Sequence, residues 1–339
     1  MLNQFFKDLP VFAWQQAEDS EDLLRGVNIK DLHLHVSATV KIAAGASTGA
    51  VVVDSPATLI ESIRIIWDGY DLVQRISGKD LLAITRRCVK QGIEPTTLAD
   101  ATAQTTAVSA DLIIPFARPW LVDPYNTVLP ALPVRQQLRV YVQWSAAVSS
   151  ATSDLGTGAI VTGSDVAVTF TVAPTMVVTQ QYNTSPAKPW AIPVISVNYA
   201  PQWSAANAAL PYQLRGTLRY DSIMFRAMQG ATAALQDSIN KITFLAGNQR
   251  FWDQTTWDTL KRMERDRFPA VPAAEVGTLF AMQASGGKLS NAVNPNALRA
   301  AGSDPRYEFN VVAPTGNPGQ IRVIEFDLLT RPGLTQLQG

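Results

Sequence analysis

The chain has 339 residues, of which 47% are hydrophobic and 17% are charged, and its 28 basic residues balance its 28 acidic ones. These values exclude a disordered or collagen-like chain, and the zero net charge argues against a protein that wraps nucleic acid. The charged fraction lies below the usual value of about 25%, so little like-charge repulsion keeps copies of the chain apart. The composition therefore favours a subunit that assembles with others.

The chain has a single cysteine, Cys88, which excludes an internal disulfide and fits folding in a reducing compartment. We interpret Cys88 as a small buried hydrophobe, because the two histidines of the chain, His33 and His35, offer little choice of a catalytic base. The first residues lack a basic segment followed by an apolar run, and no run approaches the roughly 18 apolar residues of a membrane span. We therefore expect neither a secretory signal nor a transmembrane helix.

Alternating apolar and polar residues predict strands throughout the first half of the chain. Residues 29–42 alternate in this way. Residues 59–67 lead through Asp68-Gly69 into a return strand over residues 70–76, which predicts a hairpin because such turns need positive φ. Further strands are expected over residues 111–120, 137–144, 158–172 and 176–182, and a helix that Ser77 can cap over residues 79–89.

The second half has the same character, with one strong helical pattern over residues 255–267. Thr255 or Thr256 can cap this helix, and Pro269 ends it. Strands are expected over residues 194–199, 214–226, 238–245, 276–283, 307–313 and 320–329.

Four short blocks recur in the same order in the two halves, which predicts an internal duplication. Ser-Ile pairs at 62–63 and 238–239 are followed by the glycine turns at Gly69 and Gly247 and then by a helix. The upstream strands also match, as do QLRVYVQW and QIRVIEFD downstream. These segments are residues 32–43 with 218–227, and 137–144 with 320–327.

Many short strands with proline and glycine turns indicate sandwiches or barrels. The predicted fold class is all-β, with two tandem jelly-roll (eight-stranded sandwich) domains, each with a flanking helix. We expect an N-terminal arm over residues 1–26, a first jelly roll over residues 27–183 and a second over residues 184–339. The boundary between the rolls falls within residues 145–190.

The layout resembles the double jelly-roll major capsid proteins of tailless icosahedral bacteriophages with an internal membrane, of the tectivirus and corticovirus type. The resemblance lies in LIESIRIIWDGYDLVQRISGKDLLAI (59–84), in the proline-rich DLIIPFARPW…NTVLPALP, and in the QLRVYVQW that follows. It implies a non-enzymatic virion protein, made in the host cytoplasm, whose homotrimers form pseudo-hexameric blocks that tile the capsid lattice. The implied partners are copies of itself and penton or minor capsid proteins, with no direct nucleic-acid contact.

No catalytic, cofactor-binding or metal-binding residue is predicted, and no cofactor. The glycines of GASTG (45–49) lack the lysine and the following helix of a phosphate-binding loop. His33, His35 and Asp31 share one strand face, but a metal site needs three or four ligands, so we interpret them as ordinary sheet residues. A carbohydrate- or receptor-binding β-sandwich, such as a spike or lectin, and an enzyme on a β scaffold remain open alternatives.

The arm carries six large apolar residues within its first fourteen positions: Phe5, Phe6, Leu9, Val11, Phe12 and Trp14. Pro10 divides the arm, and residues 11–24 are expected to form one amphipathic helix with an acidic polar face. Such a face disfavours anionic lipid. We expect the arm to make the inner contact of the shell, on the protein's own base or a neighbour in preference to the internal viral membrane. The alternative is an arm that only covers the first roll of its own subunit.

Overall fold

The computed structural model describes residues 4–43, 49–52, 54–88, 94–130, 137–146, 160–162, 168–184, 192–214, 219–229, 238–264, 277–282, 293–315 and 317–329. The chain divides into two compact units. Unit 1 combines Met1–Ala117 with Val128–Ala187, and unit 2 combines Arg118–Thr127 with Lys188–Gly339. The GASTG loop, the proline-rich connector over residues 183–193 and the end of the helix expected over residues 255–267 lie largely outside the described residues.

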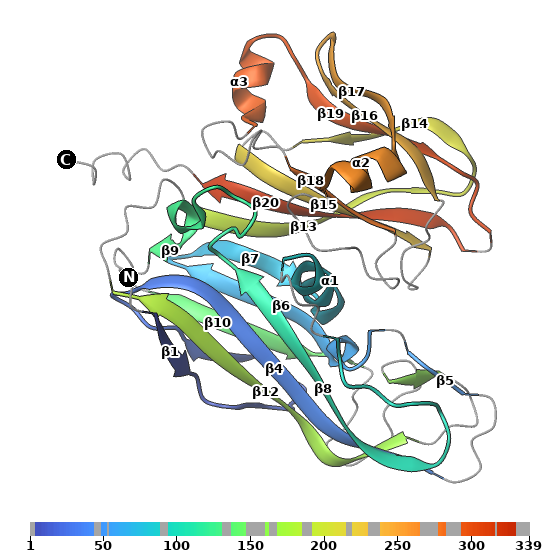
Figure 1. The fold of residues 1–339 in the computed structure, drawn as a ribbon. Coiled ribbons are helices and arrows are strands. Elements are labelled where there is room, and N and C mark those ends of the chain that lie inside the picture. The colour runs from blue at the N-terminus through green and yellow to red at the C-terminus, as the bar shows by residue number, and fades with distance from the viewer. Residues whose placement is uncertain are drawn as a thin grey trace. The chain divides into compact units, whose positions relative to one another are not determined.

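Unit 1 is built from two antiparallel sheets (Figure 1). The strands of the first sheet are β1 (Phe5–Asp8), β2 (Phe12–Ala13), β4 (Asn28–Ile42), β8 (Gln104–Pro115), β9 (Leu129–Pro130) and β12 (Val168–Asn183). Their order is β1-β12-β4-β8, with β2 also on β12 and β9 on β4. The second sheet contains β3 (Asp19–Asp22), β6 (Ile60–Trp67), β7 (Tyr70–Ile76) and β10 (Leu138–Trp144) in the order β7-β6-β10-β3.

Smaller elements complete the described part of unit 1. They are a two-stranded pair of β5 (Ala50–Val51) and β11 (Val161–Thr162), the 3-10 turn η1 (Ala57–Leu59) and the helix α1 (Gly78–Cys88). Helix α1 lies against β6 and β8.

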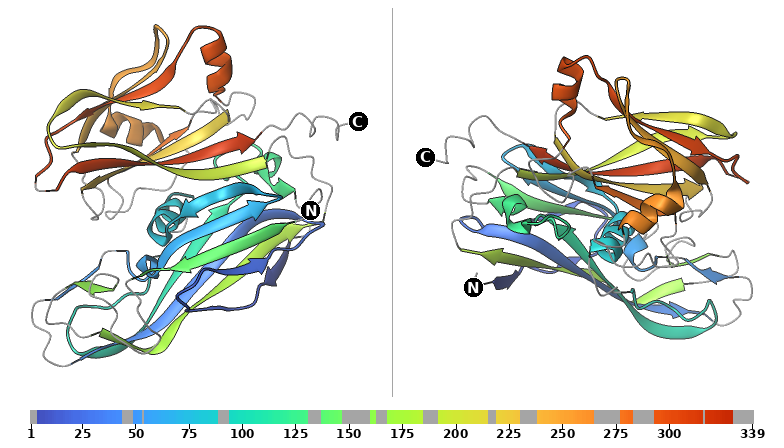
Figure 2. Two further views of the ribbon diagram at one scale, coloured as in Figure 1. Left: turned by 180° about the vertical axis from the view of Figure 1, so that it is seen from behind. Right: turned by 45° about the horizontal axis from the view of Figure 1, so that its top comes forward.

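Unit 2 also contains two antiparallel sheets (Figure 2). The first is formed by β13 (Ile192–Trp203), β15 (Arg219–Gln229), β18 (Thr278–Met282) and β20 (Gly319–Leu329), in the order β18-β15-β20-β13. The second is formed by β14 (Asn207–Gln213), β16 (Ile239–Ala246), β17 (Gln249–Thr256) and β19 (Pro305–Val311), in the order β14-β19-β16-β17. The turn η2 (Pro124–Thr127) and the helices α2 (Trp257–Glu264) and α3 (Pro295–Ala300) complete it.

The predicted period of two is confirmed in strands such as β4 and β10, where it places one face of the strand in a core. In β10, Leu138, Val140, Val142 and Trp144 are buried, whereas the residues between them are half-buried. In unit 2 the corresponding core is aromatic. Phe225 meets Tyr307 and Phe309 edge to face, with ring centroids 4.9 and 5.1 Å apart.

The predicted turn and cap residues act as expected. Asp68 and Gly69 have φ values of 46° and 85°, the left-handed conformation that joins β6 to β7. Ser77 Oγ accepts the backbone N–H of Asp80 at 3.2 Å at the start of α1. Thr256 Oγ1 accepts the backbone N–H of Thr259, also at 3.2 Å, at the start of α2.

The two units repeat one topology, which confirms the predicted duplication. Strands β1, β12, β4 and β8 of unit 1 correspond in sheet order to β13, β20, β15 and β18 of unit 2. Likewise β3, β10, β6 and β7 correspond to β14, β19, β16 and β17, and α1 corresponds to α2. One matched block is wrong: residues 137–144 lie in β10, whose counterpart is β19, whereas residues 320–327 lie in β20. Alternating apolar residues are common to all half-buried strands, so the match could not identify which strands of the two units are equivalent.

The helix expected over residues 11–24 is also wrong, because this segment supplies edge strands to unit 1. Strand β2 pairs with β12, and β3 pairs with β10. Leu9 donates its backbone N–H to Val178 O at 2.9 Å, and Leu9 and Phe12 are buried. The acidic residues of β3 are held by strand pairing and by Arg139, whose Nε donates to Asp22 Oδ1 at 2.8 Å. The backbone N–H and C=O groups at the edges of β10 and β12 need hydrogen-bond partners, and this requirement outweighs the helical pattern of the segment.

Substitution of Phe12 by alanine tests how far the arm contributes to unit 1. Phe12 is fully buried, so Phe12→Ala should lower the free energy of unfolding by about 3–5 kcal/mol. Phe6→Ala, at a side chain that is 64% exposed, is the control and should change it by less than about 0.5 kcal/mol. Urea unfolding followed by tryptophan fluorescence measures both. Equal effects would contradict a structural role for the arm.

Candidate functional site

The two histidines of the first predicted strand have different carboxylate partners. His33 Nε2 lies 3.0 Å from Asp31 Oδ1, whereas His35 Nδ1 lies 2.7 Å from Asp111 Oδ1 on the neighbouring strand β8. The described part of the chain contains no group of three or more His, Cys, Asp or Glu side chains placed to hold a metal ion. Within that part, no helix has the length and apolar character needed to cross a bilayer.

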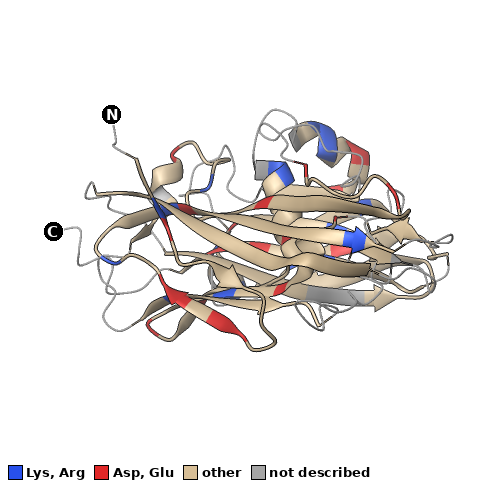
Figure 3. Cartoon of the chain, turned by 90° about the horizontal axis from the view of Figure 1, so that it is seen from below, with Lys and Arg blue, Asp and Glu red and all other residues tan. Residues whose placement is uncertain are grey.

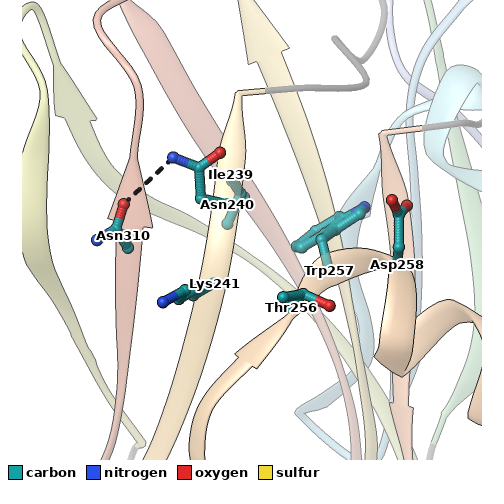
Figure 4. Close-up of a pocket in the computed structure, with 7 residues that line it drawn as sticks. All are labelled: Ile239, Asn240, Lys241, Thr256, Trp257, Asp258 and Asn310. Carbon is teal, nitrogen blue, oxygen red and sulfur yellow. Dashed lines mark hydrogen bonds between the residues drawn. The ribbon is translucent and has the colours of Figure 1, made fainter.

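A pocket of about 510 Å³ opens in unit 2 beside the start of α2 (Figure 4). Its lining comes from β16, β19, the end of β17 and the first turn of α2: Ile239, Asn240, Lys241, Thr256, Trp257, Asp258 and Asn310. Asn240 Nδ2 donates to Asn310 Oδ1 at 3.5 Å, and Trp257 is only 3% exposed. The lining combines one carboxylate and one ammonium group with two amides and a hydroxyl, and it contains no histidine or cysteine.

The exposed parts of the molecule are better suited to contacts with other chains. Strand β1 ends one sheet of unit 1 and carries Phe5 and Phe6, which are 41% and 64% exposed. Strand β3 ends the other sheet and carries three carboxylates; elsewhere charged residues are scattered over the strands (Figure 3). Edge strands with exposed backbone and apolar side chains are where copies of a protein can meet. Other large exposed apolar residues are Val11, Tyr70, Val122, Val172, Phe251, Met263 and Val312.

A buried ion pair in unit 2 fixes the segment Arg118–Thr127. Arg118 Nε lies 3.4 Å from Asp221 Oδ2, and both side chains are fully buried. The Arg118 guanidinium also donates to Val194 O at 3.0 Å and lies 4.9 Å from the ring centroid of Phe326. Trp120 Nε1 donates to the other oxygen of Asp221 at 3.1 Å. This cluster could not be predicted from the sequence, because its members lie in a proline-rich loop and in strands far apart along the chain.

Loss of the arginine should leave a buried carboxylate without its cation. Arg118→Met should therefore lower the free energy of unfolding by about 3–5 kcal/mol. The double variant Arg118→Met/Asp221→Asn should recover part of this loss, because it leaves no unpaired charge. Arg250→Met is the control and should cause no measurable change, since Arg250 and Asp253 form an exposed pair. Denaturant unfolding of wild type, these three variants and the single variant Asp221→Asn checks this, and strict additivity of the two substitutions would contradict the pairing.

The hydrogen bond to Asp31 should be visible in the titration of His33. Asp31 raises the pKa of His33 above its usual 6.5, partly opposed by burial. The charged form is thus favoured in the folded state, so the stabilisation is present below pH 6.5 and is lost as the pH rises through the raised pKa. In a His35→Asn background, the remaining histidine NMR signal should titrate above 6.5, and Asp31→Asn should lower that midpoint. An unchanged midpoint would rule out the bond.

No protein-family model and no curated protein matches the sequence. Solved structures do match. A chain in the atomic structure of Sulfolobus Turreted Icosahedral Virus has a TM-score of 0.68 at 13% identity, covering 99% of this chain and 93% of that one. The major capsid protein from bacteriophage PM2 has a TM-score of 0.60 at 13% identity, with 97% and 99% covered.

A chain of the PBCV-1 virus capsid is a third match, with a TM-score of 0.56, 8% identity, and 97% and 96% of the two chains covered. Likeness at such low identity concerns the fold, and it extends over nearly the whole chain. Each unit described above contains two antiparallel sheets, and the order of four strands in each sheet is the same in both units. The predicted all-β fold class is therefore confirmed, and the fold of this chain is the double jelly roll.

Proposed function

We propose that this chain is the major capsid protein of an icosahedral virus, a non-enzymatic subunit that assembles with copies of itself into the virion shell. The observation that carries the proposal is the extent of the structural likeness. Both rolls match the PM2 major capsid protein, and almost nothing is left over in either chain. If the chain had an activity in addition to assembly, we would expect a further domain or a cluster of catalytic side chains on the shared fold.

The surface chemistry supports assembly. The chain carries no net charge, and its exposed apolar residues include Phe5 and Phe6 at one sheet edge of unit 1 and Phe251 in the edge strand β17 of unit 2. Apolar and aromatic groups of this kind are enriched at the centres of protein interfaces. A carbohydrate-binding role has less support, because Trp257, the aromatic residue of the pocket, is buried and offers no open face for a sugar ring.

We further propose that the assembling unit is a homotrimer. Two rolls of the same topology give three copies six similar lobes, which suits a pseudo-hexameric block in a hexagonal lattice. Penton or minor capsid proteins would complete such a shell. The arm remains our candidate for the inner contact, on a neighbouring subunit or on the internal membrane, now through its exposed side chains and not through a helix.

Sedimentation of the purified chain at micromolar concentration tests the oligomeric state. The expected species has three times the monomer mass, and electron microscopy at higher concentration should show sheets or closed particles. A monomer that binds immobilised glycans would instead favour the carbohydrate-binding alternative.

The contribution of the arm can be separated from its role in folding. Phe5→Ser/Phe6→Ser changes two exposed side chains and should leave the trimer intact while lowering the yield of closed particles. Val172→Ser, at a residue that is 56% exposed on the same sheet, is the matched control. Normal particle yield from the double variant would show that the arm serves only its own roll.

A further inference from the structure

Unit 2 also contains two buried carboxyl groups that lie close together, and the proposed function does not use them. Glu325 and Asp327 lie on β20, and both are at most 1% exposed. The hydroxyl of Ser196, on the neighbouring strand β13, lies between them. Its Oγ is 3.2 Å from Glu325 Oε2 and 3.1 Å from Asp327 Oδ2.

The two carboxyl groups have unequal surroundings. Glu325 accepts hydrogen bonds from Asn198 Nδ2 at 2.5 Å and from the Tyr212 hydroxyl at 2.6 Å. Within the described residues, the hydrogen-bond donor to the Asp327 side chain is Ser196, and Asp327 Oδ1 is buried without a hydrogen-bond partner. A buried carboxylate with so few donors is costly, whereas a neutral acid is not. Glu325, which has more hydrogen-bond donors, is the better placed of the two to hold a negative charge.

The position of Ser196 limits how many protons are shared by Glu325, Asp327 and the serine hydroxyl. A serine hydroxyl has a single proton to donate, so it cannot donate to two carboxylates at once. If Asp327 is protonated, its O–H donates to Ser196 Oγ and the Ser196 O–H donates to Glu325 Oε2. Every proton between the three groups then lies in a hydrogen bond.

We propose that Asp327 is a neutral carboxylic acid at neutral pH, and that unit 2 takes up one proton as it folds and so becomes more stable as the medium is acidified. Burial, followed by the negative charge of Glu325, raises the pKa of Asp327 well above its usual 3.8. Asp221 on β15 adds to this effect, whereas Ser196 and the Arg118 guanidinium oppose it.

The sign of the pH dependence follows from the proton count. Between the usual pKa of an aspartic acid and the raised pKa of Asp327, the folded chain binds one more proton than the unfolded chain. The unfolding equilibrium constant should then rise about tenfold for each pH unit of increase within that window. Below the usual pKa both states are protonated, and the dependence disappears.

Asp327→Asn tests the proposal, because its amide can still donate to Ser196 but cannot ionise. The pKa of His33 is also raised, so the measurement uses a His33→Asn background. Denaturant unfolding between pH 5 and 7 should show stability falling as the pH rises, and Asp327→Asn should lower the slope by one proton, a factor of about ten in the unfolding equilibrium constant per pH unit. Asp253→Asn is the matched control on β17, since its side chain is 59% exposed, and it should keep the wild-type dependence. An unchanged slope in Asp327→Asn would overturn the proposal.

Infrared spectroscopy provides a second measurement that does not require Asp327→Asn to fold, and its control, Asp221→Asn, is compared only after circular dichroism shows that it is folded. At pH 7 the wild-type protein should show the carbonyl stretch of a protonated carboxylic acid, and Asp221→Asn should retain it. Burial raises the pKa of Asp221 as well, so this variant separates the two acids. Absence of the band in wild type, or its loss in Asp221→Asn, would show that Asp327 does not hold the proton.

Discussion

The antiparallel ladder between β4 and β12 is the interaction on which the rest of unit 1 depends. Its partners are distant in sequence: Asn28 Nδ2 donates to Asn183 Oδ1 across a separation of 155 residues. Strand β8 pairs with the free edge of β4, and β1 and β2 pair with the free edge of β12. Strand β20 has the same place in unit 2, between β13 and β15. Both rolls therefore rest on contacts that local sequence does not encode.

This dependence explains what the sequence could and could not predict. Strand 29–42, the hairpin at Asp68-Gly69 and the cap at Ser77 were predictable, because each is a local pattern with a local physical cause. The arm was mispredicted, because its strands exist only where the edges of β10 and β12 need partners. The equivalence of β10 with β20 failed for a related reason, since alternation specifies a half-buried strand but not its neighbour.

The buried polar clusters were even less predictable from the sequence. Asp221, Glu325 and Asp327 stand in strands where a charged residue normally faces water, yet all three are buried. Their positions became meaningful only with the partners in view, namely Arg118 in a proline-rich loop and Ser196 on another strand. Polar networks of this kind are demanding, because each member must find its partner, and they leave no periodic trace in the sequence.

The division of unit 2 into two stretches of sequence affects the order in which the chain can fold during synthesis. Segment Arg118–Thr127 leaves the ribosome before β10 and β12, but Asp221, the partner of Trp120, follows 101 residues later. At a synthesis rate of about 5–20 residues per second, that delay is roughly 5–20 seconds. The last strands of unit 1 are synthesised within this interval, before Asp221, which pairs with both Arg118 and Trp120, has been synthesised. A fragment that began at residue 188 would lack both residues permanently, so the second roll is not a separable half of the protein.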